Sequence, residues 1–233
     1  MERRDFIKAC AATCALGAPD ALLAEDLKPC FYSRVRLLGE GGKPLRAADL
    51  GVGRNYIFHY PFEGTPCFLL NLGTPTVRDV TLKTEGGAAY LWPGGVGPKR
   101  SIVGFSAICT HRLTYPTPQI SFISYREKSS VPTSRANVIH CCSEHSQYDP
   151  AAGAKVVAGP APQPLSAVLL EYDAKSDGLQ AVGTLGGEMF DAFFAKFEFK
   201  LALEPGGGSP RRRVEGQAVV KRIEEYCKQQ VRC

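Results

Sequence analysis

Two short segments of this sequence each pair a cysteine with a histidine, AICTHRL from 107 to 113 and HCCSEHSQYDP from 140 to 150. The first holds a Cys-x-His spacing and the second a Cys-x-x-His spacing. Thiolate sulfur and neutral imidazole nitrogen are ligands for zinc, iron and copper. We therefore expect both pairs to close on one metal centre, with the ligands Cys109, His111, Cys142 and His145.

The composition is that of one ordinary domain with appendages. The chain has 233 residues, and its 44% hydrophobic content can fill a core. Its 24 glycines and 17 prolines favour short strands and many loops over long helices. The net charge of +5 is modest and forms no basic stripe interleaved with aromatic residues, which disfavours nucleic-acid binding.

Short apolar runs bounded by glycine and proline predict an all-β fold. Ser176-Asp177-Gly178 reads as the turn of a hairpin between two of these runs. Such strands at close spacing are typical of a sandwich or barrel. The expected strand segments are 31–38, 55–61, 67–73, 79–84 and 101–108, with the hairpin at 167–183.

Both ends of the chain read as appendages. Residues 1–24 contain Arg3-Arg4 before a short apolar stretch, which resembles a twin-arginine export signal and implies a periplasmic protein. Cleavage near Ala24 and retention as an inner-membrane anchor both stay open. At the other end, 204–233 reads as a linker followed by one helix over 214–231, either packed on the domain or docking a partner.

The spacing of the first pair favours iron over zinc. Zinc sites usually have two to five residues between the ligands of a close pair, and Cys-x-His, with one residue between them, is tight for both side chains to reach one ion. It suits a loop whose cysteine faces one iron and whose histidine faces the other, as in a [2Fe-2S] cluster with two histidines on one iron.

Residues 100–185 resemble the Rieske family. The resemblance rests on the ordered set CTH (109–111), the Cys142–His145 pair, SQYDPAAG (146–153) and AGPAPQPL (158–165). It implies an antiparallel β-sandwich over 25–203, with an inserted cluster-binding subdomain whose loops span about 107–165. It also implies a [2Fe-2S] cluster with Cys109 and Cys142 on one iron and His111 and His145 on the other.

The resemblance also implies roles around the cluster. Ser146 and Tyr148 match residues that donate hydrogen bonds to cluster and cysteine sulfur in high-potential members, which favours a potential in the upper part of the range of roughly −150 to +300 mV. Gly159 and Pro160 lie in the loop expected to cover the cluster.

Three departures from the family pattern stand out. Thr114 and Glu144 occupy the places of two cysteines that form a disulfide in respiratory members, and the stretch between the two boxes is long. The second box is also one residue short before Tyr148. An ungapped match would place Cys141 and Glu144 as ligands, which we disfavour because carboxylate substitutes poorly for imidazole. His140 and Cys141 stay nearby alternatives, and disulfide pairing stays open among Cys30, Cys67, Cys141, Cys227 and Cys233.

These patterns predict an exported electron-transfer protein. We expect a subunit of a periplasmic or membrane-associated redox complex that passes one electron from a quinol or partner enzyme to a cytochrome c-like acceptor. A small subunit of an arsenite-oxidase-like enzyme is a close alternative, and a structural zinc module is a third. An oxygenase is disfavoured because only His59 and His140 remain for a second iron site.

Overall fold

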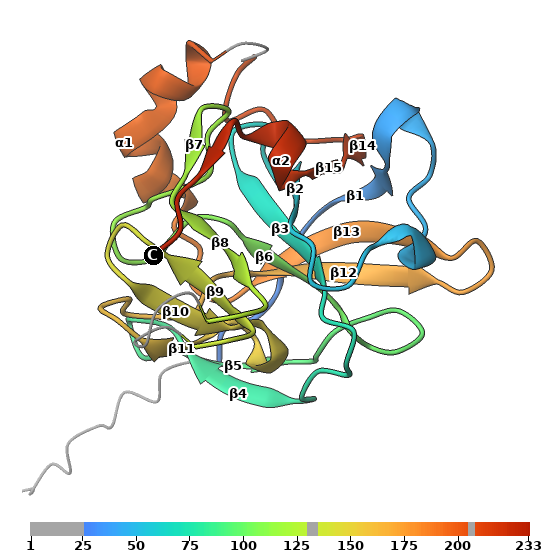
Figure 1. Ribbon diagram of the computed structural model, residues 1–233, viewed down its shortest axis with the longest axis horizontal. Coiled ribbons are helices and arrows are strands. Elements are labelled where there is room, and N and C mark those ends of the chain that lie inside the picture. The colour runs from blue at the N-terminus through green and yellow to red at the C-terminus, as the bar shows by residue number, and fades with distance from the viewer. Residues whose placement is uncertain (1–25, 130–134, 205–207) are drawn as a thin grey trace, which may run out of the picture.

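The computed structural model describes residues 26–129, 135–204 and 208–233, so the predicted leader lies outside the described residues. Its centre is an eight-stranded sheet (Figure 1). All neighbours in this sheet are antiparallel except the β1–β14 pair, which is parallel. In sheet order the strands are β14 (Gly216–Val219), β1 (Cys30–Leu38), β13 (Gly178–Leu185), β12 (Ala167–Asp173), β6 (Ile102–Ser106), β3 (Pro66–Asn71), β2 (Tyr56–His59) and β15 (Lys221–Arg222).

The middle of this sheet is buried on both faces, which explains its continuous apolar runs. On β3, Phe68 and Leu70 belong to one core cluster, whereas Cys67 and Leu69 belong to another. Alternate side chains of a strand point to opposite faces. The all-β expectation is therefore confirmed, with apolar layers on both sides of the sheet.

A second sheet, four-stranded and antiparallel, is formed by a segment that is inserted in the sequence between two strands of the main sheet. It is built from β8 (Ile123–Arg126), β9 (Val138–Cys141), β10 (Ser146–Asp149) and β11 (Lys155–Ala158), in the order β11-β10-β9-β8. The whole sheet lies in the sequence between β6 and β12, which pair with each other in the main sheet. The predicted cluster loops therefore lie in a subdomain that is inserted between two paired strands of the main sheet.

Shorter elements complete the fold. β4 (Val80–Lys83) pairs with β5 (Ala89–Trp92), and β7 (Ile120–Ser121) pairs in parallel with β16 (Gln229–Gln230). Among the described residues, the α-helices are α1 (Phe190–Ala202) and α2 (Ile223–Tyr226). Short 3-10 helices there cover Glu40–Gly42, Ala47–Asp49 and Pro150–Ala152. None of the helices in the described ranges is both long and apolar enough to cross a membrane.

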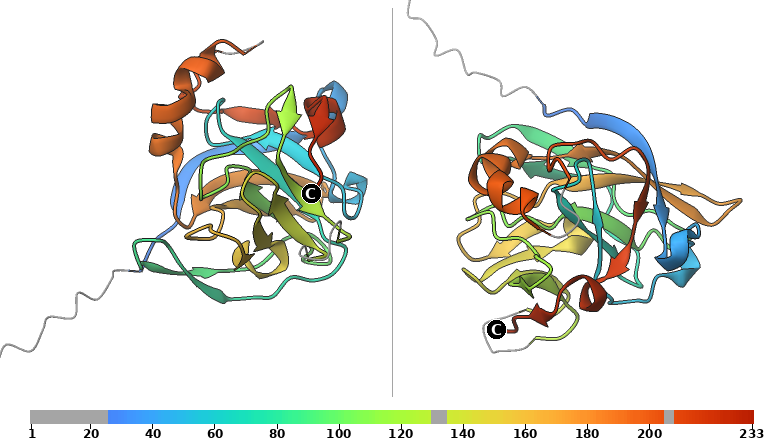
Figure 2. Two further views of the ribbon diagram at one scale, coloured as in Figure 1. Left: turned by 60° about the vertical axis from the view of Figure 1, so that its left-hand side comes forward. Right: turned by 90° about the horizontal axis from the view of Figure 1, so that it is seen from above.

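The C-terminal region differs from the expected single helix over 214–231. Only α2 is helical there, while β14, β15 and β16 pair with other strands. The backbone groups of this region form hydrogen bonds with β1, β2 and β7. This strand pairing prevails over the helical preference that the spacing of the apolar residues indicates. The longest helix, α1, lies earlier, on the outside of the body (Figure 2), in a phenylalanine-rich segment that the strand and turn patterns did not identify.

Candidate metal centre

The first loop is a tight turn after β6 that buries Cys109. The Leu113 N–H donates to the Cys109 carbonyl, and the Cys109 N–H donates to the Thr114 carbonyl, both at 2.8 Å. Leu113 adopts a φ of 63°, a left-handed conformation that closes the turn. Cys109 is 1% exposed, whereas His111 is half-buried. The loop therefore directs a sulfur inward and leaves an imidazole nearer the surface.

Helix α1 supports this loop from outside. The rings of Tyr115 and Phe193 meet edge to face with centroids 4.9 Å apart, and Leu113 belongs to the same apolar cluster. The Lys196 ammonium donates to the Arg112 carbonyl at 3.1 Å. The helix missed from the sequence thus helps to hold the segment that carries Cys109 and His111.

The second loop joins β9 to β10 in a hairpin. Cys141 pairs with Ser146 in this register, so residues 142–145 form the turn. His145 has a φ of 60°, which is unusual for a histidine and turns the chain back into β10. The register makes Cys141, at the end of β9, the cysteine that faces the interior, and it is fully buried.

Cys109 and Cys141 come from different loops and lie in one buried core cluster. The neighbouring Cys141 thiol lowers the pKa of Cys109 to about 6, although burial acts in the opposite direction. The same contact raises the pKa of Cys141. The lowered pKa therefore favours the thiolate form of Cys109, and the raised pKa favours the thiol form of Cys141. Thiolate is the form that binds metal.

Tyr148 and Thr110 connect this sulfur pair to the rest of the subdomain. The Tyr148 hydroxyl lies 3.3 Å from the Cys109 sulfur and accepts from the Thr110 N–H at 3.2 Å. The Thr110 hydroxyl donates to the Gln163 carbonyl at 2.8 Å, in the segment predicted to cover the cluster. A hydroxyl beside a cysteine sulfur is the contact expected for Tyr148.

Two buried polar atoms beside the sulfur pair have no hydrogen-bond partner within the described part of the chain. They are His111 Nδ1 and Ser146 Oγ. Buried polar atoms are seldom left without partners, and those that are usually mark a functional group or a bound species. An imidazole nitrogen and a hydroxyl fit the needs of a thiolate-bound iron–sulfur group, the first as ligand and the second as donor to sulfur.

Cys142 does not join this site, which corrects the expectation that it is a ligand. Its sulfur forms a disulfide with Cys233, with the two Cα atoms 5.7 Å apart. A disulfide sulfur carries no thiolate charge, so it cannot replace Cys141 beside Cys109. The bridge attaches the second loop to the C-terminal residue, which lies beside the four-stranded sheet (Figures 1 and 2).

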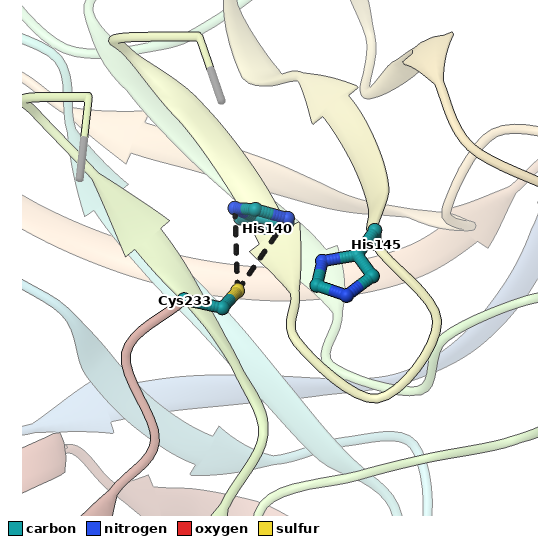
Figure 3. A group of neighbouring side chains, drawn as sticks. All are labelled: His140, His145 and Cys233. Carbon is teal, nitrogen blue, oxygen red and sulfur yellow. Dashed lines mark hydrogen bonds between the residues drawn. The ribbon is translucent and has the colours of Figure 1, made fainter. Parts of the chain in front are cut away.

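Within the described residues, His145 likewise has neither a hydrogen bond nor a ring contact with Cys109 or Cys141. Its side chain is exposed, and its ring lies 5.9 Å from the ring of buried His140, between centroids. Figure 3 shows both rings close to the Cys233 sulfur, and one donor atom from each of the three residues lies within 4.8 Å of the others. His145 therefore faces the bridge side of the loop.

Gly159 packs against the turn that holds His145. Its φ is +84°, and a Cβ at this position would lie 2.5 Å from the Ser146 Cα and 2.6 Å from the His145 carbonyl oxygen. Only glycine allows this approach without displacing backbone. Pro160 follows in the same exposed turn. The segment expected to cover the site therefore packs directly against the second loop.

Cys141 was available to sequence reasoning through the ungapped match to Tyr148. Thr110 and Gln163 lie in motifs that the sequence identified, but no role was predicted for them. Cys233 was expected to pair, if at all, with another of the five cysteines named above, whereas its partner is Cys142. A cavity of about 650 Å³ lies elsewhere, and none of the expected ligands lines it.

No family model matches the chain. Among solved structures it is similar to the crystal structure of the soluble domain of Rieske protein II (soxF) from Sulfolobus acidocaldarius. The identity is 26%, over 66% of this chain and 78% of that chain, with a TM-score of 0.46. Backbones that agree this loosely assign no role to individual residues here.

Proposed function

We propose that this chain is a Rieske-type electron-transfer protein that holds a [2Fe-2S] cluster between its two loops. The observation that carries the proposal is the buried Cys109–Cys141 pair, which has the Tyr148 hydroxyl at one sulfur. In this arrangement Cys109 and Cys141 hold one iron, and His111 Nδ1 is a ligand of the other. A cluster so bound supplies reversible one-electron transfer.

The chain's own residues set the conditions for that transfer. Tyr148, Ser146 and the backbone N–H groups of the loops stabilise negative charge on sulfur, which favours the reduced state. Burial of both cysteines keeps water from their sulfur atoms. His111 is half-buried beside exposed Arg112, so the imidazole side is the side that a redox partner can approach.

The cellular setting belongs to the same proposal. The chain is exported by the twin-arginine route and works as a subunit of a periplasmic or membrane-associated redox complex. Its electron donor is a quinol or a partner enzyme, and its acceptor is a cytochrome c-like protein. Replacing both Arg3 and Arg4 with lysine should leave the protein in the cytoplasm, which cell fractionation would detect; export of that variant would contradict the route.

EPR of the purified, dithionite-reduced protein tests the cofactor, with iron and sulfide counted on the same sample. We expect two irons and two sulfides per chain, as the cluster's composition requires, and a rhombic signal of low average g. A sample that contains zinc and no sulfide would contradict electron transfer. It would favour the structural zinc module, since two thiols and an imidazole also suit zinc.

A further inference from the structure

Each of the two loops begins at a buried cysteine. Cys109 follows β6 and is 1% exposed, and Cys141 ends β9 and is fully buried. Cys142, by contrast, is bound to Cys233. The second loop therefore wraps around Cys141 rather than Cys142, and its ligand positions are counted from Cys141.

Counted from Cys141, the Cys-x-x-His spacing places Glu144 where the second histidine is expected. The Glu144 carboxylate reaches across to the first loop, where its Oε1 lies 3.5 Å from the Arg112 Nε. Arg112 directly follows His111. The side chain of Glu144 is 34% exposed, so it lies at the partly covered edge of the loops on which His111 also lies.

The neighbouring histidine is directed elsewhere. His145 is exposed, and its ring lies with His140 and the Cys233 sulfur (Figure 3). Its carbonyl oxygen lies under Gly159, and the disulfide from Cys142 holds the preceding part of the turn. The backbone of the turn that carries His145 is therefore held on both sides.

We propose that a carboxylate oxygen of Glu144 is the fourth ligand of the cluster, on the iron that His111 binds, in place of a second histidine. This inference rests on the proposed function. Carboxylate is an anionic ligand and imidazole a neutral one, so the cluster carries one more negative charge than a two-histidine centre. That charge lowers the reduction potential, and the guanidinium of Arg112 offsets part of the effect.

The exchange also leaves a single ligand imidazole. A donor that transfers a hydrogen atom would therefore have His111 as its one imidazole contact.

The experiment is pulsed EPR of the reduced full-length protein, which counts strongly coupled imidazole nitrogens, combined with a redox titration. In the wild type we expect one such nitrogen. Glu144→His should add a second nitrogen and raise the potential. His145→Gln should leave both the nitrogen couplings and the potential unchanged, and it is the matched control because it alters the adjacent residue.

The outcomes separate the ligand from the function. Two nitrogens in the wild type, one of which disappears in His145→Gln, would overturn the role of Glu144 and leave the cluster intact. A wild type without sulfide would overturn the cluster itself and the ligand with it. A third variant, Glu144→Gln, removes the carboxylate, but it can also lose the cluster through poor folding. Iron and sulfide are therefore counted in Glu144→His as well. If Glu144→His recovers the cluster, the loss in Glu144→Gln is a loss of ligation and not of structure.

Discussion

The hydroxyl oxygen of Tyr148 lies 3.3 Å from the sulfur of Cys109, although 39 positions separate the two residues in the chain. This contact links β10 to the first loop at the atom expected to bind iron. A hydrogen bond to a charged group contributes about 1.5–3 kcal/mol. Its loss should matter more in the reduced state, where sulfur carries more negative charge.

Tyr148→Phe should therefore lower the reduction potential. If the bond is about 1 kcal/mol stronger in the reduced state, the shift is about 40 mV. Tyr125→Phe is the matched control. The hydroxyl of buried Tyr125 donates to Asn137 Oδ1 at 3.1 Å, and within the described residues it forms no hydrogen bond with Cys109. Redox titration followed by visible absorbance measures both variants, and equal shifts would argue against a specific role for Tyr148.

Serine substitutions distinguish the two adjacent cysteines of the second loop. Cys109→Ser and Cys141→Ser should each abolish cluster binding, because each removes a sulfur of the buried pair. Cys142→Ser should keep the cluster, since that sulfur belongs to the bridge with Cys233. Iron and sulfide per chain are the measurements. Loss in Cys142→Ser with retention in Cys141→Ser would restore the ligand set expected from the sequence.

Reduction of the Cys142–Cys233 bridge should destabilise the folded protein. The bridge spans 91 residues of sequence. A cross-link over a loop of that length is worth about 4–5 kcal/mol if its effect comes from restricting the unfolded chain. Thermal unfolding with and without a phosphine reductant should show a lower Tm after reduction in the wild type. Cys233→Ser should not respond, whereas Cys30→Ser should, because Cys30 is a free, exposed cysteine.

Gly159→Ala should disturb the second loop. Positive φ and a Cβ overlap with the Ser146 Cα together should cost about 2–4 kcal/mol of unfolding free energy. Gly87→Ala is the control, because Gly87 has a φ of +85° and nothing within 4 Å of the added carbon. Urea unfolding and cluster content measure the difference. Equal losses in the two variants would assign the effect to φ alone.

Stability should also fall in mild acid because of His59. Burial lowers the pKa of His59 to about 4, and the nearby charge of Lys221 acts in the same direction. The unfolded chain then binds a proton between pH 6.5 and about 4 that the folded protein does not, so stability decreases as pH falls through this range. The contribution is on the order of 1–3 kcal/mol. Urea unfolding between pH 4 and 8 should show a smaller slope for His59→Gln, and an unchanged slope would remove His59 as the cause.

The sequence by itself determined β1, β2, β3, β4 and β6, the β12–β13 hairpin at 167–183 and the place of the first loop, but not the strands of the four-stranded sheet. Apolar runs, glycine and proline are local signals. Cys109 and His111 lie two positions apart directly after a strand, so the sequence alone places them in one loop. The resemblance of the ordered motifs to a known family, and not local composition, indicated the segments 146–153 and 158–165 as parts of the site.

Only the tertiary structure decided which second cysteine faces Cys109. Cys141 and Cys142 are adjacent, and in a strand adjacent side chains point to opposite faces, so a shift of one residue exchanges the two. The β9–β10 register directs Cys141 inward, and the outward position of Cys142 is matched to Cys233, which arrives from the far end of the chain. The C-terminal strands follow the same logic, because pairing partners distant in sequence outweigh the helical pattern of residues 214–231.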